Sequence, residues 1–593
     1  MGFNTNLIRT ALGKEPADLI IRGGKLVNVH SGQIYETDIA VRDGRIASIG
    51  PLPEGTAGPD THIIEGTGFY VAPGFIDAHI HIESSMLTYT EFSKAVVCRG
   101  TTAVASDLME VTIVSGIPGL KELLKEAQNT AVRLYYPVPS FMGEDESAFH
   151  TTGSTLMPEM IEELMNLPEA TGLAEVLCPP ILAESEASRK VLSIAEARGK
   201  TAEGHAPALM GAELNAYASC GIRSDHESTH KDEALAKLRA GLRVYIREGS
   251  ASSDLREALR AVTEDGADTR YISLISDDID ALHIKDFGHQ DNKVRLAIQA
   301  GVNPIDAIRM VTINPAESLK IDHECGSLVP GKLADIVMLT SLEDCRVSKV
   351  FSSGILIAEE QNGSPVLIRE IPTPSYDSRL LDTVKLMKPV YASDLLLTAP
   401  GAKSAKVHVI GASGRSLLTE SLNADLSISD TVIGADPHRD ILHIACVERY
   451  GKHGCVGKSF IKGIGLKAGA IAISVGHDHH NITVVGTNGE DMAIAVNHVS
   501  ELHGGIVYCK EGAILSEIPL PVCGLLSLES ADSVAESLRG LIRILAKNGC
   551  LLPSPNVTLS FISLIFIPDL AITDLGLFDV KKFAIIDPVI SLS

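Results

Sequence analysis

The chain has 593 residues, more than a single hydrophobic core normally organises, so we expect two or three domains. Its 75 acidic residues outnumber 51 basic ones and give a net charge of −24, which disfavours nucleic acid or an anionic membrane as a partner. The ten cysteines form no Cys-x-x-Cys pair, residues 1–18 lack the apolar core of a signal peptide, and the apolar run 557–567 is too short to cross a bilayer, so we expect a cytoplasmic protein.

Short alternating strands are predicted for residues 18–70, where Asp43-Gly44 is typical of a tight hairpin turn. Similar sequence returns at residues 326–359. We therefore predict a small β-sandwich domain built from residues 1–72 and 321–375, on both sides of an inserted domain.

The inserted segment, residues 73–320, alternates apolar runs with helical patterns. Eight strands that alternate with helices over about 250 residues are typical of a (β/α)8 TIM-type barrel. An open, doubly wound sheet is the alternative, but the segment contains nothing that resembles the Gly-rich phosphate turn of that fold. The predicted strands are 78–82, 102–106, 133–138, 172–175, 201–205, 221–226, 243–247 and 271–276.

From about residue 390 the sequence becomes rich in glycine and in strand-like runs, with some helices, as far as Ser593. We predict an additional α+β domain over residues 390–593. The predicted fold class is thus α/β: a TIM-type barrel, a β domain from its two flanks, and a separate C-terminal domain.

His79 and His81 end an apolar run that contains Pro73-Gly74. Side chains alternate between the faces of a strand, so residues two apart point the same way and can hold one metal ion. For an isolated pair, a strand end that merely exposes two histidines is the alternative. The strands of a (β/α)8 barrel all end at one mouth, however. Polar residues at the other strand ends therefore help to decide between a metal site and two exposed histidines.

The predicted strand ends together carry four imidazoles and two carboxylates. Four imidazoles suit Zn, Fe, Mn or Co, and a carboxylate can bridge two ions with its two oxygens. Any one of these residues alone would more often be structural, but six at the ends of the predicted strands favour a site for two metal ions. We expect Glu175 to be the bridge. The candidate ligands are His79, His81, Glu175, His205, His226 and Asp277.

Longer motifs extend over the barrel segment and the C-terminal domain. They are Pro73–Met86, Thr171–Glu175, Gly204–Pro207, Leu214–Tyr217, Ser224–Glu227, Ile246–Ser250, Ile313–Ala316, His477–Asn481, Gly486–Asn488 and Leu551–Pro555. A chain with these motifs resembles the adenine deaminase family of the amidohydrolase superfamily, over nearly its whole length. The His-x-His pattern specifies only the superfamily, whereas His81-Ile-Glu-Ser-Ser-Met86 and the C-terminal motifs are specific to the family.

The resemblance implies metal-dependent hydrolysis of adenine to hypoxanthine and ammonia, with two divalent ions (Mn, Fe or Zn) and a small purine base as the ligand; we also expect a homodimer or a higher homo-oligomer. A hydroxide that bridges two cations can attack C6 of the base at neutral pH, because the ions lower the pKa of bound water. Asp277 would pass the hydroxide proton to the departing amine, and Glu248 is a second catalytic candidate. Residues at or just beyond strand ends could bind the base, or be ordinary loop residues. They are Glu83, Ser85, Glu110, Arg247 and Asp278.

One position departs from the family pattern. The family usually carries Asp-Pro-His-Glu after the second barrel strand, and this chain has Asp107-Leu-Met-Glu110, so Met109 stands where a histidine is expected. If that histidine shapes the purine pocket, the substrate preference differs here. Another aminopurine or a cyclic amide is therefore the alternative substrate, since the same hydroxide can attack a carbonyl carbon.

A second metal motif is present: His226 and His230 match H-E-x-x-H, which on one helix would form the zinc site of a metalloprotease. Residues 221–225 instead indicate strand and loop, and Ser228 or Thr229 is the expected N-cap of a helix over 232–240. On that prediction His226 precedes the helix, and the two histidines need not share a face.

Residues 477–480 form a dense His-Asp-His-His cluster. The cluster could bind a further metal, or reach a barrel mouth, for example that of a neighbouring subunit. We favour the alternative, a structural, hydrogen-bonded turn that ends in Asn481.

Overall fold

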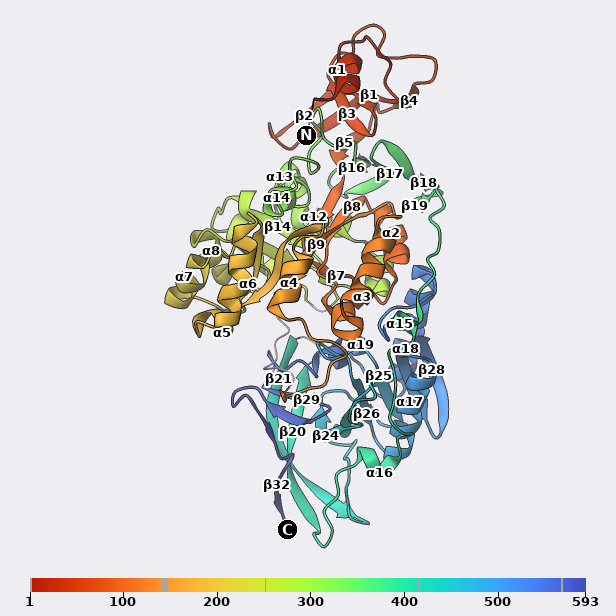
Figure 1. The fold of residues 1–593 in the computed structure, drawn as a ribbon. Coiled ribbons are helices and arrows are strands. Elements are labelled where there is room, and N and C mark those ends of the chain that lie inside the picture. Colours follow the sequence, from red (N-terminus) through yellow and green to blue (C-terminus); the bar gives the residue numbers. More distant parts are fainter. Residues whose placement is uncertain (1–2, 141–147, 251, 414–415, 567–568) are drawn as a thin grey trace.

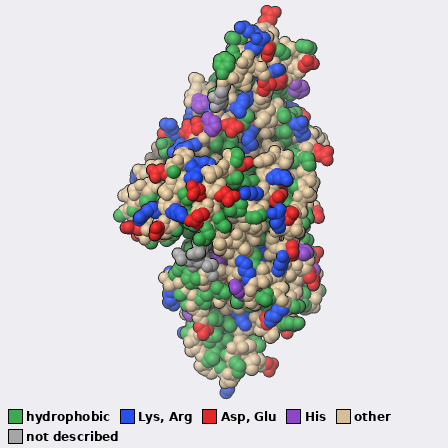
Figure 2. All heavy atoms as spheres, viewed as in Figure 1, with side chains coloured by type: hydrophobic (Ala, Val, Ile, Leu, Met, Phe, Trp, Pro, Cys, Tyr) green, Lys and Arg blue, Asp and Glu red, His purple; other side chains and the backbone are tan. Residues whose placement is uncertain are grey.

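The computed structural model describes residues 3–140, 148–250, 252–413, 416–566 and 569–593. Its three parts follow one another along a single long axis: a β-rich end with the N-terminus, a central barrel, and a sheet-rich domain with the C-terminus (Figure 1). On the face shown in Figure 2, acidic and basic side chains lie interspersed over the barrel. No helix in the described part of the chain is long and apolar enough to cross a membrane.

Strands from both flanks of the barrel join in one nine-stranded sheet, as predicted. The two flanks meet where β16 pairs antiparallel with β5. The predicted turn at Asp43-Gly44 joins β2 to β3 with both residues at positive φ, as a two-residue hairpin turn requires. The strands are β1 (Leu19–Asn28), β2 (Gln33–Arg42), β3 (Arg45–Ile49), β4 (His62–Glu65), β5 (Tyr70–Pro73), β16 (Ile336–Ser341), β17 (Arg346–Ser352), β18 (Ile355–Gln361) and β19 (Ser364–Leu367), and α1 (Thr5–Ala11) precedes them.

Eight parallel strands form the central barrel, and seven of them overlap the predicted strands. The first strand lies earlier than predicted: its ladder ends at Asp77, and within the predicted strand 78–82 only Ile80 and His81 are paired. The predicted strand 221–226 is paired only over two residues. The strands are β6 (Phe75–Asp77), β8 (Thr101–Ala105), β9 (Arg133–Pro139), β10 (Ala170–Leu177), β11 (Thr201–His205), β12 (Ser224–Asp225), β13 (Arg243–Arg247) and β14 (Ile272–Ile275).

The barrel closes at its mouth, between extensions of its first and last strands. β7 (Ile80–His81) continues β6, β15 (Asp277–Asp278) continues β14, and the two extensions pair in parallel. Towards the opposite end, the N–H of Ile76 donates to the carbonyl of Val311 at 2.7 Å and that of Leu274 donates to Met310 at 3.0 Å, so residues 310–311 bridge the first and last strands. The closing ladder therefore consists of residues at the candidate site.

Helices follow the strands and surround the barrel (Figure 1). The helix predicted over 232–240 begins at Lys231, and the prediction that Ser228 or Thr229 is its N-cap was wrong. His230 occupies that position, and the N–H of Thr229 is instead satisfied by the Glu233 carboxylate at 3.3 Å. The helices are α2 (Tyr89–Val97), α3 (Met109–Ala127), α4 (Pro158–Leu164), α5 (Cys178–Leu182), α6 (Glu186–Ala197), α7 (Gly211–Ser219), α8 (Lys231–Arg239), α9 (Leu255–Ala258), α10 (Arg260–Thr263), α11 (Ala281–Phe287), α12 (Gln290–Gln299), α13 (Pro304–Arg309) and α14 (Ile313–Ser318).

The C-terminal domain is built on a ten-stranded sheet, with a smaller three-stranded sheet beside it. The large sheet comprises β20 (Ser404–Ser413), β21 (Ser416–Ser429), β22 (Val432–Ile433), β23 (Ile441–Val447), β24 (Val456–Lys462), β25 (Ala470–Ile473), β26 (Ile482–Gly486), β27 (Gly505–Lys510), β28 (Ala513–Pro519) and β32 (Val589–Leu592). The small sheet comprises β29 (Leu570–Thr573), β30 (Gly576–Asp579) and β31 (Ala584–Ile586), and the helices are α15 (Ser378–Leu381), α16 (Ala392–Leu395), α17 (Gly489–Glu501), α18 (Ala531–Lys547) and α19 (Pro555–Phe561).

This domain packs against the mouth end of the barrel. The N–H of Ser527 donates to the carbonyl of Met86 at 2.8 Å, and Asp574 accepts hydrogen bonds from both the backbone and the hydroxyl of Thr151. At the periphery, Lys285 of α11 pairs with Asp532 of α18 at 2.9 Å. The contacts bring the C-terminal domain over the ends of the barrel strands; the exact domain limits stay a prediction.

Candidate metal centre and active site

Glu175 is placed by an irregularity in its strand. The register of β10 against β11 shifts between Leu173 and Val176, and Glu175 has a φ of +48°. A bulge of this kind changes the direction in which one side chain points. A left-handed backbone conformation at a residue other than glycine is strained, and such strained residues are frequent at functional sites. The carboxylate is buried at the barrel mouth.

Four imidazoles surround this carboxylate. The Nε2 atoms of His81, His79 and His226 lie 3.1, 3.3 and 3.7 Å from Glu175 Oε1. The Nδ1 atom of His205 lies 4.0 Å from the other oxygen, Oε2. Glu175 therefore faces histidines through both of its oxygens, as a bridging carboxylate does.

Asp277 joins the group from the last strand. Its Oδ1 atom lies 3.5 Å from His79 Nε2 and 3.6 Å from His81 Nε2. Its backbone has a φ of +57°, and its N–H donates to the carbonyl of His79 at 3.1 Å. The structure thus brings all six predicted ligands together, although they come from five different regions of the chain.

The donor atoms have the spacing that a metal centre needs. Ligands about 2.1 Å from a tetrahedral ion are separated from each other by about 3.4 Å, close to the distances around Glu175. His79 Nε2 and His205 Nδ1 are buried and have no hydrogen-bond partner among the described residues. A divalent ion would satisfy both atoms, so the residues present fit the metal pair. The overlapping triads are His79-His81-Asp277, His79-Glu175-His226 and His205-His226-Glu227.

The local electrostatics favour cations. Burial would lower the pKa of His79, but the nearby carboxylates of Asp277, Glu175 and Glu203 raise its pKa well above the usual value. Burial would likewise raise the pKa of Glu175, but the imidazoles of His79 and His81 beside it hold its pKa well below the usual range. The negative charge of these carboxylates, which favours protonated imidazoles, would also stabilise bound metal ions.

Arg247 orients the second oxygen of Asp277. Its guanidinium donates to Asp277 Oδ2 at 3.2 Å, to Glu227 at 2.7 Å and to Asp254 at 2.9 Å. Sequence reasoning missed Glu227, although it directly follows His226 and ends a quoted motif. Its carboxylate lies 3.2 Å from His226 Nε2, so it belongs to the same charged network.

The pocket above these groups has walls from two domains. The barrel supplies Met109, Glu110, Arg247 and Asp278 in addition to most of the ligands, and the C-terminal domain supplies His477, Asp478, Phe561, Leu564 and Phe566. The pocket thus combines apolar and charged side chains from both domains, which suits a flat, heteroatom-rich ring.

The His477–Asn481 segment is the hydrogen-bonded turn that we favoured from the sequence. The N–H of Gly476 donates to His480 Nδ1 at 3.1 Å, and that of Asn481 donates to His479 Nδ1 at 3.0 Å. The same turn also reaches the mouth of its own barrel, because His477 and Asp478 line the pocket. The two predictions for this cluster were therefore not exclusive.

Three predicted residues do not reach the walls of this pocket, within the part of the chain that the structure describes. Burial and the charges of Glu110 and Asp107 raise the pKa of Glu83 to about 8, and its carboxylate accepts from the N–H of Val111 at 3.3 Å. The Ser85 hydroxyl donates to the Ile82 carbonyl within its own turn. Glu248 follows β13 and pairs with Ser253.

The H-E-x-x-H pair does not form a helical zinc site. His226 is buried beside Glu175, whereas His230 is exposed at the N-cap of α8. The two side chains therefore serve different parts of the structure.

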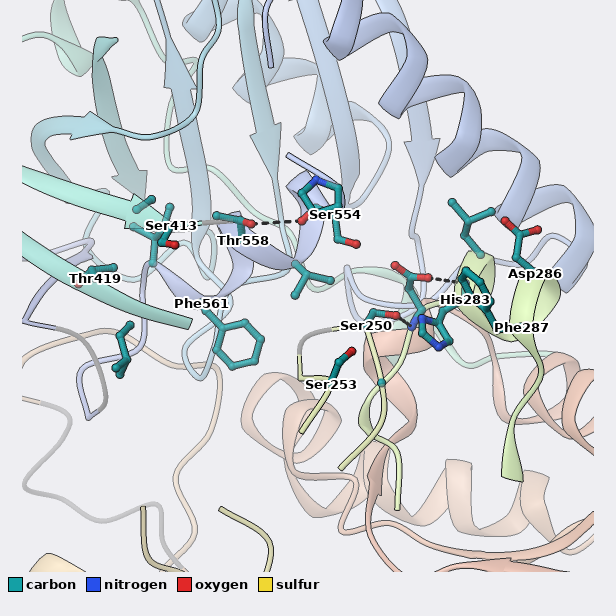
Figure 3. A pocket seen from close by; sticks show the side chains of 18 residues that line it. Ser250, Ser253, His283, Asp286, Phe287, Ser413, Thr419, Ser554, Thr558 and Phe561 are labelled. Carbon is teal, nitrogen blue, oxygen red and sulfur yellow. Dashed lines mark hydrogen bonds between the residues drawn. The ribbon is translucent and has the colours of Figure 1, made fainter. Parts of the chain in front are cut away.

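A larger cavity of about 520 Å³ adjoins this pocket (Figure 3). Ser250, Ser253 and His283 line it from the barrel, and Thr558 lines it from α19. Phe561 belongs to the walls of both cavities.

Comparison with known proteins agrees with this two-domain site. The model of the amidohydrolase family matches residues 70–357, and that of the adenine deaminase C-terminal domain matches residues 416–584. An adenine deaminase of Moorella thermoacetica is 37% identical over 585 residues, covering 98% of this chain and 97% of that one. The chain belongs to the adenine deaminase family. Adenine deaminase 1 of Carboxydothermus hydrogenoformans is 39% identical over 589 residues, covering 97% of this chain and 96% of that protein.

Both parts of this adenine deaminase family member meet at the pocket. The amidohydrolase match contains the six candidate ligands, and the adenine deaminase C-terminal match contains His477 and Phe561. A solved structure described as an adenine deaminase superposes with a TM-score of 0.45 at 19% identity, covering 57% of this chain and 99% of that one.

Proposed function

We propose that this chain hydrolyses adenine to hypoxanthine and ammonia with two divalent metal ions. The observation that carries the proposal is the position of Glu175, whose two oxygens face four imidazoles. His79, His81 and Asp277 would hold one ion, His205 and His226 the other, and Glu175 would bridge them. When bound, the ions make water acidic enough to attack carbon at neutral pH.

Asp277 would move the proton of the attacking water. Its Oδ1 atom faces the metal ligands, and its Oδ2 atom is held by Arg247. The guanidinium fixes the rotation of the carboxylate, so a proton taken at the centre can be released to the departing amine without a change of side-chain position.

The purine ring would lie between the ligands and the aromatic side of the pocket. Leu177, Met109 and Phe561 offer apolar contact to its faces, and Asp278 offers an acceptor at its edge. An adenine base presents both an amino group and ring nitrogens, so it satisfies these polar groups where an aliphatic amide would leave some of them unpaired.

The test is a substrate panel on metal-loaded protein: adenine, other aminopurines, and cyclic amides, scored by ammonia release and by the ultraviolet spectrum of the product. We expect adenine to be converted to hypoxanthine with the highest kcat/KM. Faster hydrolysis of a cyclic amide than of adenine would contradict the proposal. Elemental analysis of the same sample identifies the metal as Mn, Fe or Zn, and light scattering measures the predicted homodimer or higher oligomer.

A further inference from the structure

A turn from the C-terminal domain reaches over the barrel mouth and contacts α3. The Nδ1 atom of His477 lies 2.8 Å from Glu110 Oε1, and His480 Nε2 makes a short hydrogen bond to Glu110 Oε2. All three side chains are buried. The ring of His477 also lies against Phe561, with centroids 4.5 Å apart and planes 30° apart. The imidazole is therefore fixed both at its edge and on its face.

The hydrogen bonds determine which ring nitrogens carry protons. The N–H of Gly476 donates to His480 Nδ1, so the proton of a neutral His480 must lie on Nε2, where it donates to Glu110. Burial lowers the pKa of His480, which is consistent with a neutral ring. The second oxygen of Glu110 is then left to accept from Nδ1 of His477. His477 consequently turns its other nitrogen, Nε2, towards the pocket.

The Nε2 atom of His477 lies on the substrate side. It is 3.9 Å from Asp278 Oδ1, and both residues line the pocket together with the metal ligands. A carboxylate behind one imidazole nitrogen, with the other nitrogen facing the substrate, is the arrangement that orients histidines for proton transfer in many enzymes. Glu83, another buried acid predicted at this site, lies outside the described pocket walls.

A cation site is the competing interpretation, because Glu110, His477 and Asp478 are close enough to share a metal ion. The hydrogen bonds favour protons over a metal. Both Glu110 oxygens already accept from imidazole nitrogens, and His480 presents an N–H rather than a lone pair to the carboxylate.

We propose that His477 is a catalytic residue, and that its Nε2 gives a proton to the ring nitrogen next to the carbon that water attacks. Glu110 and His480 act as positioning residues behind it. The proposal rests on the proposed deamination of adenine and adds a catalytic role for the C-terminal domain.

The proton balance of the reaction requires such a donor. As the water oxygen bonds to carbon, the electron pair of the C=N bond moves to the ring nitrogen, which takes the proton from His477. The C–N bond to the amino group then breaks, and the amine leaves as ammonia with the proton carried by Asp277. The proton that water released before its attack replaces the one that His477 gave up, and the new ring N–H remains in hypoxanthine.

The charge on His477 agrees with this role. Burial would lower its pKa, but the Glu110 carboxylate in contact with it, together with Asp278 and Asp478, raises its pKa to about 10. The ring therefore carries a proton on Nε2 at neutral pH, before the substrate reacts.

The test compares His477→Ala, His477→Gln and wild type, all loaded with metal. We expect kcat on adenine to fall by about 10² to 10⁴-fold in both variants, the usual contribution of one general acid. Metal content and the Kd for hypoxanthine, measured by calorimetry, should stay near wild type. Added imidazole should restore part of the turnover of His477→Ala, which a merely structural role would not allow. His443→Gln replaces another buried histidine of the domain, on β23, and should keep the wild-type kcat.

Glu110→Gln tests the positioning role separately. A glutamine can present an amide N–H to His477 and so reverse the preferred tautomer of that ring. We expect kcat to fall with little change in KM, and added imidazole to give no rescue, because the cavity left by His477→Ala is absent. Glu110→Asp, which keeps the charge, should recover part of the lost kcat.

The outcomes separate the two proposals. If wild type deaminates adenine and His477→Ala does so equally well, His477 is not the donor and the proposed function stands. If metal-loaded wild type leaves adenine unchanged, the proposed function itself fails. A third equivalent of metal that disappears in Glu110→Gln would make the cluster a cation site and overturn the donor role. Should circular dichroism show that His477→Ala is unfolded, His477→Gln and Glu110→Gln decide the matter by the same criteria.

Discussion

The barrel mouth and the C-terminal turn contribute to one pocket in different ways. At the mouth, side chains extend from the ends of parallel strands of one barrel, so the fold itself brings His79, His205 and His226 together. The turn at His477–Asn481 belongs to another domain and reaches the pocket only because that domain packs on the barrel. The comparison indicates that metal binding depends on the barrel alone, whereas proton delivery depends on the contact between domains.

The largest effect is expected from Glu175→Gln. The amide loses the negative charge that four imidazoles share, and one of its two oxygens becomes an amide nitrogen that cannot bind a cation. Metal content should drop, and kcat on adenine should fall by about 10³-fold or more, because bound metal ions stabilise the transition state by several kcal/mol. Glu196→Gln, an exposed change on α6, is the control. A Glu175→Gln protein with two metals and normal kcat would show that neither metal binding nor turnover at the barrel mouth depends on the Glu175 carboxylate.

Asp277→Asn should separate metal binding from proton transfer at the barrel mouth. The amide oxygen can still face His79 and His81, but the side chain can no longer take up a proton at the pH of the assay. We expect retained metal and a kcat lower by about 10² to 10⁴-fold. The measurements are elemental analysis and ammonia release on one preparation. Full turnover would remove the proton-transfer role from Asp277.

Asp574→Ala addresses the contact between the domains. This buried carboxylate accepts from the backbone and hydroxyl of Thr151 and from the amide of Asn481, at the end of the turn. The change leaves buried donors unpaired and should lower the free energy of unfolding by about 2–3 kcal/mol, with a higher KM for adenine and unchanged metal content. Urea unfolding measures the first effect.

The peripheral contact between the same domains provides the matched control. Arg539 of α18 pairs with Asp286 of α11 at the surface, so Arg539→Ala should change the free energy of unfolding by less than about 1 kcal/mol and leave KM unchanged. Equal effects of the two variants would contradict the assignment of Asp574 as the contact that positions the turn.

Met109→His gives the smallest expected effect. Met109 is a buried wall residue of the pocket, and a histidine there would add a hydrogen-bonding group for the purine edge. We expect kcat/KM for adenine, relative to other aminopurines, to rise by about tenfold, a difference of about 1.4 kcal/mol. Met109→Leu keeps the wall apolar and should leave the ratio unchanged. An unaltered ratio in Met109→His would mean that this position does not set substrate preference.

The sequence was sufficient for the barrel and the six candidate ligands because both follow from short-range periodicity. Spacing by two residues predicted that His79 and His81 face the same way, and parallel strands in a barrel end at one place. In the structure His79 lies between β6 and β7, and both imidazoles face Glu175. Glu83 and Ser85 follow the same strand, but the chain turns there into a short 3-10 helix at Ile82–Ser85, which removes them from the pocket. Strand periodicity does not extend past such a turn.

The contribution of the C-terminal domain could not be predicted in the same way. Glu110 and His477 are 367 positions apart, and their contact depends on how two complete domains pack. The sequence motif at His477–Asn481 did identify the right residues. Whether they formed a structural turn or reached a barrel mouth remained open, and in the structure they do both.

The most direct test is anomalous diffraction from crystals of the metal-loaded protein. The account predicts two peaks about 3.5–4 Å apart, one on each side of the Glu175 carboxylate, with His79, His81 and Asp277 around one and His205 and His226 around the other. A single peak away from Glu175, or an active crystal with no peak at the barrel mouth, would contradict it.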